Sequence, residues 1–139
     1  MSGVLWFIGL VTVLSTAGAL AGQLFEASAT SQGTFNAPPI RLWPQALRLR
    51  AVSKDLEQQG MRITSLYRDD ETNERVNGAA GSLHKEARAL DGVVDSPENR
   101  PRVVDRLRQL RDAGLVSTWD EHDKGSGMHL HVELRPDDP

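Results

Sequence analysis

The stretch that decides the fold is SLHKEARALD, residues 82–91, together with a second stretch near the C-terminus, HLHVE, residues 129–133. In a β-strand, residues two apart point to the same face, so His129, His131 and Glu133 would project to one side and the apolar residues between them to the other. Zinc binds imidazole nitrogens and carboxylate oxygens, and a catalytic zinc site has three protein ligands and an open position for water. Two histidines and an aspartate from these segments fit that description.

The sequence before residue 82 predicts one helix and one strand. Pro44 can occupy the first turn of a helix, and apolar residues then recur with helical spacing until Gly60, which predicts a helix over residues 44–59. Residues 61–67 alternate apolar and polar side chains and favour a strand that leads directly into Arg68.

The middle of the chain predicts a loop, a strand and a second helix. Residues 69–81 are polar, with a turn signal at Asn77-Gly78, and residues 87–94 indicate a short buried strand that carries Asp91. Ser96-Pro97 can cap a helix whose apolar face continues to about Ala113-Gly114.

The C-terminal part completes an α+β domain. Residues 115–119 and 129–134 predict two more strands, joined by a Gly-rich loop over residues 121–127. Together these elements predict a small, largely antiparallel sheet with helices packed on one face.

An uncharged apolar segment precedes this domain. Residues 4–24 contain no charged side chain and have about the ~20-residue length that crosses a bilayer as a helix. We interpret residues 1–25 as a transmembrane anchor or a signal segment; the small residues Ala27-Ser28-Ala29 favour cleavage, whereas the missing positive n-region favours an anchor. Residues 26–42 then form a flexible linker and residues 43–139 the folded domain. A cleaved signal segment would export the domain, and an uncleaved one would anchor it at a membrane.

Composition narrows the function further. The 139 residues, less the apolar segment, leave one domain of about 100 residues. A net charge of −3 without a dense Lys/Arg stripe argues against a nucleic-acid partner. Because the chain has no cysteine, any bound metal must be held by histidines and carboxylates. The sequence makes no prediction of an oligomeric state.

Each candidate residue also has a simpler explanation. Taken alone, His129 and His131 fit a half-solvated strand, His84 a surface loop, and Arg68 a surface cation. The two separated segments occurring together in one small domain favour the metal site over these explanations.

Three motifs resemble one family. Ser82-x-His84-x-x-Ala87-x-Ala89-x-Asp91 is similar to the Ser-x-His-x-x-Gly-x-Ala-x-Asp signature of the D-alanyl-D-alanine carboxypeptidase family of zinc peptidases. Ser65-Leu66-Tyr67-Arg68 resembles that family's Ser-Gly-Tyr-Arg, and the following loop resembles the family's at Asn73 and at residues 76–79. This resemblance implies the fold shared with lysostaphin-type endopeptidases and the hedgehog domain, and cleavage of peptide bonds in peptidoglycan.

By resemblance, the metal ligands are His84, Asp91 and His131, the cofactor is Zn²⁺, and Arg68 stabilises the negative charge on the scissile carbonyl oxygen. The resemblance also places the catalytic domain on the extracytoplasmic side of the membrane.

The chain departs from the family at the position of the general base. Many members have an acid three residues before the last histidine ligand, where this chain has Met128. We expect His129 to act as the base, since relatives of the lysostaphin and murein-endopeptidase type have a His-x-His whose first histidine assists catalysis. Asp120 and Glu121 are the alternatives.

Three further observations complete the expectations. Glu133 is expected to hydrogen-bond a ligand, because metal-bound imidazoles usually donate their second N–H to a carboxylate or carbonyl, although it also fits a plain sheet surface. Ala87 and Leu66 stand where relatives often have glycine. A zinc-containing module that binds cell-wall peptides or a protein without cutting is the alternative function, and Met128 favours it.

Overall fold

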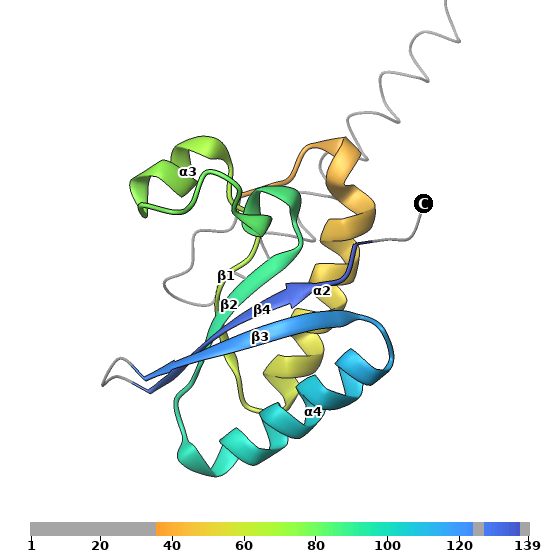
Figure 1. Ribbon diagram of the computed structural model, residues 1–139, viewed down its shortest axis with the longest axis vertical. Coiled ribbons are helices and arrows are strands. Elements are labelled where there is room, and N and C mark those ends of the chain that lie inside the picture. Colours follow the sequence, from red (N-terminus) through yellow and green to blue (C-terminus); the bar gives the residue numbers. More distant parts are fainter. Residues whose placement is uncertain (1–35, 124–126, 137–139) are drawn as a thin grey trace, which may run out of the picture.

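The computed structural model describes residues 36–123 and 127–136 as an α+β fold in which four antiparallel strands form one sheet (Figure 1). In chain order the strands are β1 (Arg62–Ser65), β2 (Ala89–Val94), β3 (Val116–Asp123) and β4 (Met128–Leu134). The order across the sheet is β1-β2-β4-β3, so β4 lies between β2 and β3. This order puts β2 and β4, which carry Asp91 and His131, side by side.

The two long helices cover one face of the sheet. They are α2 (Trp43–Gln58) and α4 (Arg100–Asp112), and Figure 1 shows α2 behind β4 and α4 alongside β3. Alternate residues of β4 are buried beneath them, namely Leu130, Val132 and Leu134. The helices contribute Leu49, Leu56, Val103, Leu107 and Leu110 to the same core. Burial of this apolar surface fixes which face each strand residue occupies.

The remaining elements are short. They are the 3₁₀ turns η1 (Ile40–Leu42), η2 (Leu83–Glu86) and η3 (Pro97–Asn99), and the helix α3 (Asp70–Arg75). The side chain of Asp69 accepts from the backbone N–H of Thr72 and so caps α3. This cap satisfies one of the amide groups that a helix start leaves unpaired.

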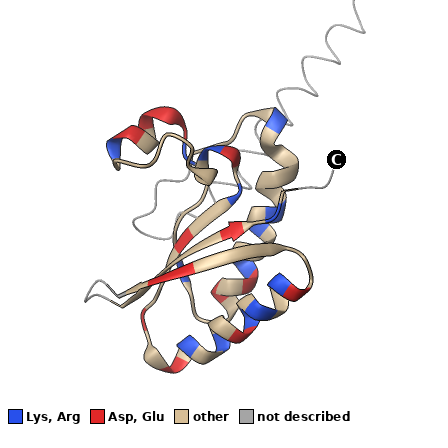
Figure 2. Cartoon of the chain, viewed as in Figure 1, with Lys and Arg blue, Asp and Glu red and all other residues tan. Residues whose placement is uncertain are grey.

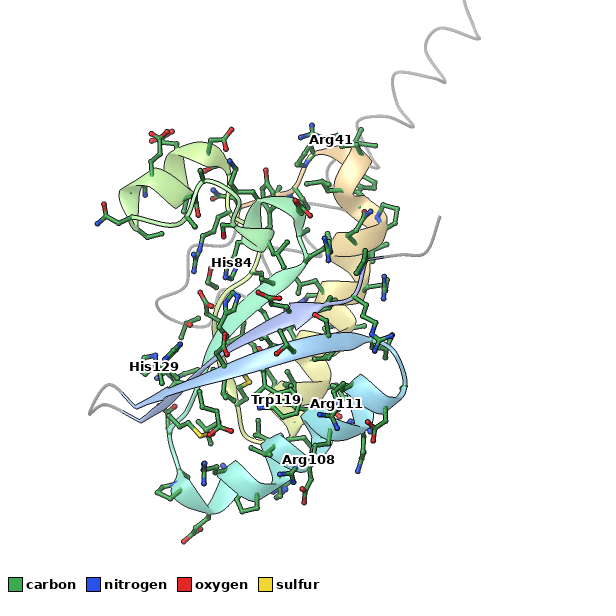
Figure 3. All side chains as sticks on the ribbon, in the orientation of Figure 1. Arg41, His84, Arg108, Arg111, Trp119 and His129 are labelled. Carbon is green, nitrogen blue, oxygen red and sulfur yellow. The ribbon has the colours of Figure 1, made fainter. Side chains whose placement is uncertain are left out.

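Figure 2 shows charges of both signs alternating along α4, whereas β3 and β4 carry acidic residues and no lysine or arginine. On the α4 side of β3, the guanidinium carbon of Arg111 lies 5.6 Å from the centroid of the Trp119 ring (Figure 3). This cation–π contact helps to hold α4 against the edge strand.

Two predictions about local structure are wrong. Residues 69–81 are not a continuous loop, because α3 forms behind its Asp69 cap. Residues 121–123 continue β3 and are not part of a Gly-rich loop, since they pair with residues 128–130 of β4. In both cases a polar sequence forms regular structure because the cap or the neighbouring strand supplies hydrogen bonds that composition does not reveal.

Residues assigned to the linker contact the domain. The Asn36 side chain donates to Asp69 Oδ2 at 2.7 Å and to Thr72 Oγ1 at 2.8 Å, and Leu42 packs against the core. Within residues 36–123 and 127–136, no helix is long and apolar enough to span a bilayer. The predicted anchor or signal segment, residues 1–25, lies outside the described residues and stays a prediction.

Candidate metal centre

His84 is held by the backbone that follows β1. Its Nδ1 lies 2.6 Å from the carbonyl oxygen of Leu66, and its own carbonyl accepts from the backbone N–H of Arg68 at 3.2 Å. The side chain is almost fully buried, and Nε2 has no hydrogen-bond partner. Since Nδ1–H donates to Leu66, Nε2 of the neutral ring carries a lone pair into the site. His84 is therefore not a surface loop residue, as the simpler explanation would have it.

Asp91 and His131 are directly opposite each other on β2 and β4. His131 Nδ1 lies 2.7 Å from Asp91 Oδ1, and His84 Nε2 lies 3.2 Å from the same oxygen. Ligand atoms of the three residues all lie within 4.8 Å of one another, the one such group of three found among the described residues. The sequence-predicted ligands thus converge from β2, β4 and η2.

The donor set fits a divalent cation. An imidazole lone pair and a carboxylate oxygen 3.2 Å apart repel each other unless a proton or a metal ion lies between them. Two imidazoles and one carboxylate are ligands that zinc accepts. The orphaned, buried Nε2 of His84 is the strongest sign that a cation binds here, because buried polar atoms are nearly always paired.

The electrostatics of the pair support the same conclusion. Burial would raise the pKa of Asp91, but the hydrogen bond from His131, the adjacent imidazole of His84 and the charge of Arg68 hold that pKa well below its ordinary value. The hydrogen bond that His131 donates to the Asp91 carboxylate raises the pKa of His131 above its ordinary value, against the effect of burial. Asp91 is therefore an anion, ready to bind a cation, throughout the neutral pH range.

Two further charged residues contact the ligands. Arg68 Nη2 donates to Asp91 Oδ2, and the two side chains are only 16% and 28% exposed. Glu133 Oε1 lies 3.5 Å from His131 Nε2, which is the outer contact expected from the sequence. Such partners fix the orientation of a ligand ring.

Of the three candidate general bases, Asp120 and His129 lie on the face of the sheet that carries the metal ligands, and Glu121 lies on the other face. Directly opposite residues share a face, and Asp120 is opposite His131 on β3, with β-carbons about 4.5–5.5 Å apart for such pairs. His129 lies two residues from His131 on the same face, opposite Val93 and His122, and is labelled in Figure 3. Asp120 and His129 are thus both on the face of the metal ligands.

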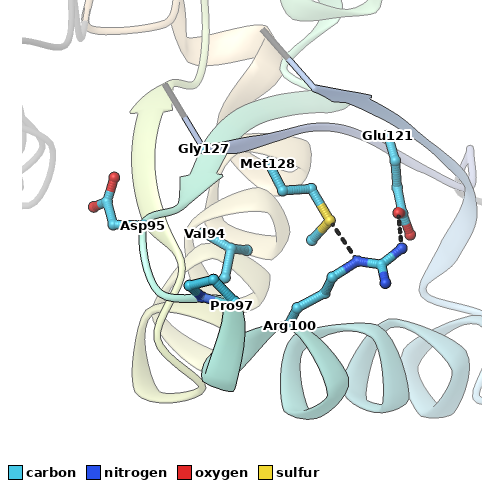
Figure 4. Close-up of a pocket in the computed structure, with 7 residues that line it drawn as sticks. All are labelled: Val94, Asp95, Pro97, Arg100, Glu121, Gly127 and Met128. Carbon is cyan, nitrogen blue, oxygen red and sulfur yellow. Dashed lines mark hydrogen bonds and ion pairs between the residues drawn. The ribbon is translucent and has the colours of Figure 1, made fainter. Parts of the chain in front are cut away.

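Glu121 and Met128 are on the helix face. Figure 4 shows both beside Arg100, whose Nη2 lies 2.9 Å from Glu121 Oε2 and whose Nε lies 3.0 Å from Met128 Sδ. They line a cavity of about 570 Å³ at the start of α4, on the other side of the sheet from the ligands. The strand alternation explains this, because residue 128 is an odd number of positions from His131. Glu121 is thus placed away from the predicted chemistry.

Sequence reasoning missed two groups at the site. The Leu66 carbonyl orients His84, and the hydroxyl of Ser65 accepts from Arg68 Nε at 2.8 Å. A carbonyl leaves no trace in a sequence. Ser65, however, lies three residues before Arg68 within the quoted motif, and that spacing at a strand end was available as a signal.

The fold and site define a class of protein: a small α+β domain with a candidate metal centre of two histidines and one aspartate on the open face of an antiparallel sheet. The family model of peptidase M15 matches residues 19–131, so the chain belongs to the peptidase M15 family, the zinc peptidases of D-Ala-D-Ala carboxypeptidase type. This confirms the resemblance carried by the three motifs. Neither curated proteins nor solved structures gave a match to the chain.

Proposed function

We propose that the protein is a zinc-dependent peptidase that hydrolyses peptide bonds in the stem peptides of peptidoglycan, as a D-Ala-D-Ala carboxypeptidase or a murein endopeptidase. The observation that carries this proposal is the convergence of His84, Asp91 and His131, with an unpaired Nε2 on the most buried of the three. Membership of the peptidase M15 family supports a metallopeptidase.

The residues around the ligands have distinct tasks. A zinc ion, when bound, would polarise the scissile carbonyl and lower the pKa of water toward ~7. Arg68 has a guanidinium beside Asp91, where it can stabilise the negative charge that develops on the carbonyl oxygen. Glu133 steadies the ring of His131 through Nε2. Asp91 supplies the negative charge that compensates the cation.

We propose that His129 accepts the proton of the attacking water. Its place on the same face as His131 supports this role, and Met128, at the usual position of the base, has a thioether that cannot accept the proton. Asp120 shares that face and is the alternative. Replacing His129 by Ala should keep the metal and abolish most turnover, whereas survival of turnover would transfer the role to Asp120.

The substrate implies a location. We propose that the domain acts outside the cytoplasmic membrane, exported or anchored by the uncharged segment over residues 4–24. Fractionation of cells into soluble and membrane parts, with detection of the full and the shortened chain, distinguishes the two routes.

Two measurements test the peptidase proposal. Purified protein should contain one zinc per chain, and it should release amino acids or peptides from peptidoglycan. His131→Ala should lose both properties, because it removes a ligand whose Nδ1 lies 2.7 Å from Asp91. Equal release by wild type and His131→Ala would refute the proposal.

The second candidate function is a zinc-containing module that binds cell-wall peptides or a protein without cutting. Met128, which replaces the acid at the usual position of the base, favours it. Stoichiometric zinc without hydrolysis of peptidoglycan or of D-Ala-terminated peptides would establish this alternative and exclude the peptidase.

A further inference from the structure

Ser65 is a buried polar residue whose contact the proposed reaction does not use. It is the last residue of β1, is 7% exposed, and is paired with Asp91 across an irregularity in the β1–β2 register. Its hydroxyl oxygen accepts from Nε of Arg68 at 2.8 Å. A buried hydroxyl in a small domain needs a partner, and here that partner is the cation beside the metal ligands.

The guanidinium of Arg68 joins Ser65 to Asp91. Nε–H and one N–H of Nη2 lie on the same edge of the planar group, and this edge is occupied by the Ser65 hydroxyl and by Asp91 Oδ2. The other edge, with Nη1, has no hydrogen-bond partner within the described part of the chain. That edge is available to a substrate oxygen.

The two oxygens of Asp91 are thereby divided. Oδ2 accepts from Arg68, while Oδ1 faces His131 Nδ1 at 2.7 Å and His84 Nε2 at 3.2 Å. An Asp91 carboxylate held in this way offers one oxygen to a metal and keeps the other on the cation. Without the hold, the carboxylate can rotate, and Arg68 can swing away from the ligand.

We propose that Ser65 is a positioning residue: its hydroxyl fixes the guanidinium of Arg68 so that Arg68 both aligns Asp91 for the metal and presents its free edge to the substrate. The inference rests on the proposed function, since it requires that the three ligands hold zinc. It extends the role of Arg68, which the family resemblance assigned to the substrate alone, to the metal ligand.

The proposal predicts a coupled loss in two properties. Outer partners of metal ligands typically affect metal affinity or activity by about 10–100-fold. Ser65→Ala in the full-length protein should therefore lower zinc affinity about 10-fold and lower kcat by a similar factor at saturating zinc. Ser65→Thr keeps the hydroxyl and suits a strand, so it should restore both. Arg68→Lys keeps the charge but not the planar fork, and should also weaken zinc binding.

Zinc affinity is measured by competition with a chromogenic chelator, and kcat and KM with a peptidoglycan-derived peptide. Ser53→Ala is the matched control, because Ser53 is also buried, donates to the Arg50 carbonyl within α2, and lies outside the site. Circular dichroism reports whether each variant is folded.

The outcomes separate the two proposals. If the wild type binds zinc and cleaves, while Ser65→Ala matches it in zinc affinity and kcat, the role of Ser65 is refuted and the peptidase stands. Equal impairment of a folded Ser65→Thr and Ser65→Ala would also refute it. If the wild type binds no zinc, the proposed function fails and this inference fails with it.

Discussion

Asp91→Asn is the sharpest test of the site, because it changes charge and hydrogen bonding without changing size. The asparagine side chain would keep an acceptor for His131 Nδ1, but either its amide NH₂ would face Arg68 Nη2 or the flipped amide would face His131. In either orientation the amide NH₂ faces another hydrogen-bond donor. The substitution also removes the anion that the two imidazoles and Arg68 surround.

The magnitude follows from these contacts. A hydrogen bond to a charged group contributes about 1.5–3 kcal/mol. Because the Asp91 side chain is 28% exposed, solvent screening favours the lower end, about 1.5–2 kcal/mol of unfolding free energy for the metal-free protein. For a domain of roughly this size, that lowers Tm by about 6–16 °C. Zinc at about 100 times its Kd should add about 2.7 kcal/mol to the wild type and little to Asp91→Asn.

Thermal melts followed by circular dichroism, with EDTA and then with zinc, measure both effects. Asp95→Asn is the matched control: its carboxylate pairs with the exposed Arg62 just beyond the other end of β2 and is 54% exposed. It should lose little stability and keep the full response to zinc. A zinc response in Asp91→Asn as large as in the wild type would show that Asp91 is not a ligand, and the metal centre would be refuted.

Three further predictions concern the backbone, pH and the second face of the sheet. Ala87→Gly should change the unfolding free energy by less than about 1 kcal/mol in urea titrations, because relief of the left-handed φ of 54° offsets the lost methyl group and the added entropy of the unfolded chain. Ala46→Gly inside α2 is the control, and it should lower the unfolding free energy by about 1.5–2 kcal/mol. A similar cost at both positions would contradict this. The metal-free protein should be most stable between about pH 4 and 6.5. The raised pKa of His131 gives stability that is complete below the pKa of the unfolded chain and is lost as pH rises through the pKa of the folded protein. The lowered pKa of Asp91 gives stability that is lost as pH falls below the pKa of the unfolded chain. Denaturation in EDTA across pH checks this, and a profile that is flat on both sides would refute the ion pair. Glu121→Gln should leave peptide release unchanged, since Glu121 pairs with Arg100 on the helix face; a large loss would show that it reaches the site.

The sequence predicts the strands that have one buried face. The alternation of residues 128–134 is enough to place His129, His131 and Glu133 together, because a shift by one residue would bury the polar set. The apolar residues around Asp91 likewise predict the buried strand that carries it. The helices α2 and α4 follow from apolar spacing and from Pro and Gly at their ends.

The sequence does not predict features that depend on distant contacts. The burial of His84 depends on a carbonyl 18 residues away, and no local pattern indicates it. The length of β3 is hidden because Asp120 and Glu121 are both polar, although one faces the ligands and the other pairs with Arg100. The six residues of α3 are too few for an apolar period, and only the Asp69 cap with acids in the first turn marks that helix.

The two hydrogen bonds between residues 66–68 and His84 hold the ends of the intervening segment together. Since lengthening a closed loop costs only about 0.6 kcal/mol per doubling, residues 69–81 can vary in length without moving the histidine. The rim of the site can therefore diversify in evolution while the ligand geometry stays constant, and grafting a loop from a relative is a practical way to redesign which peptide is accepted.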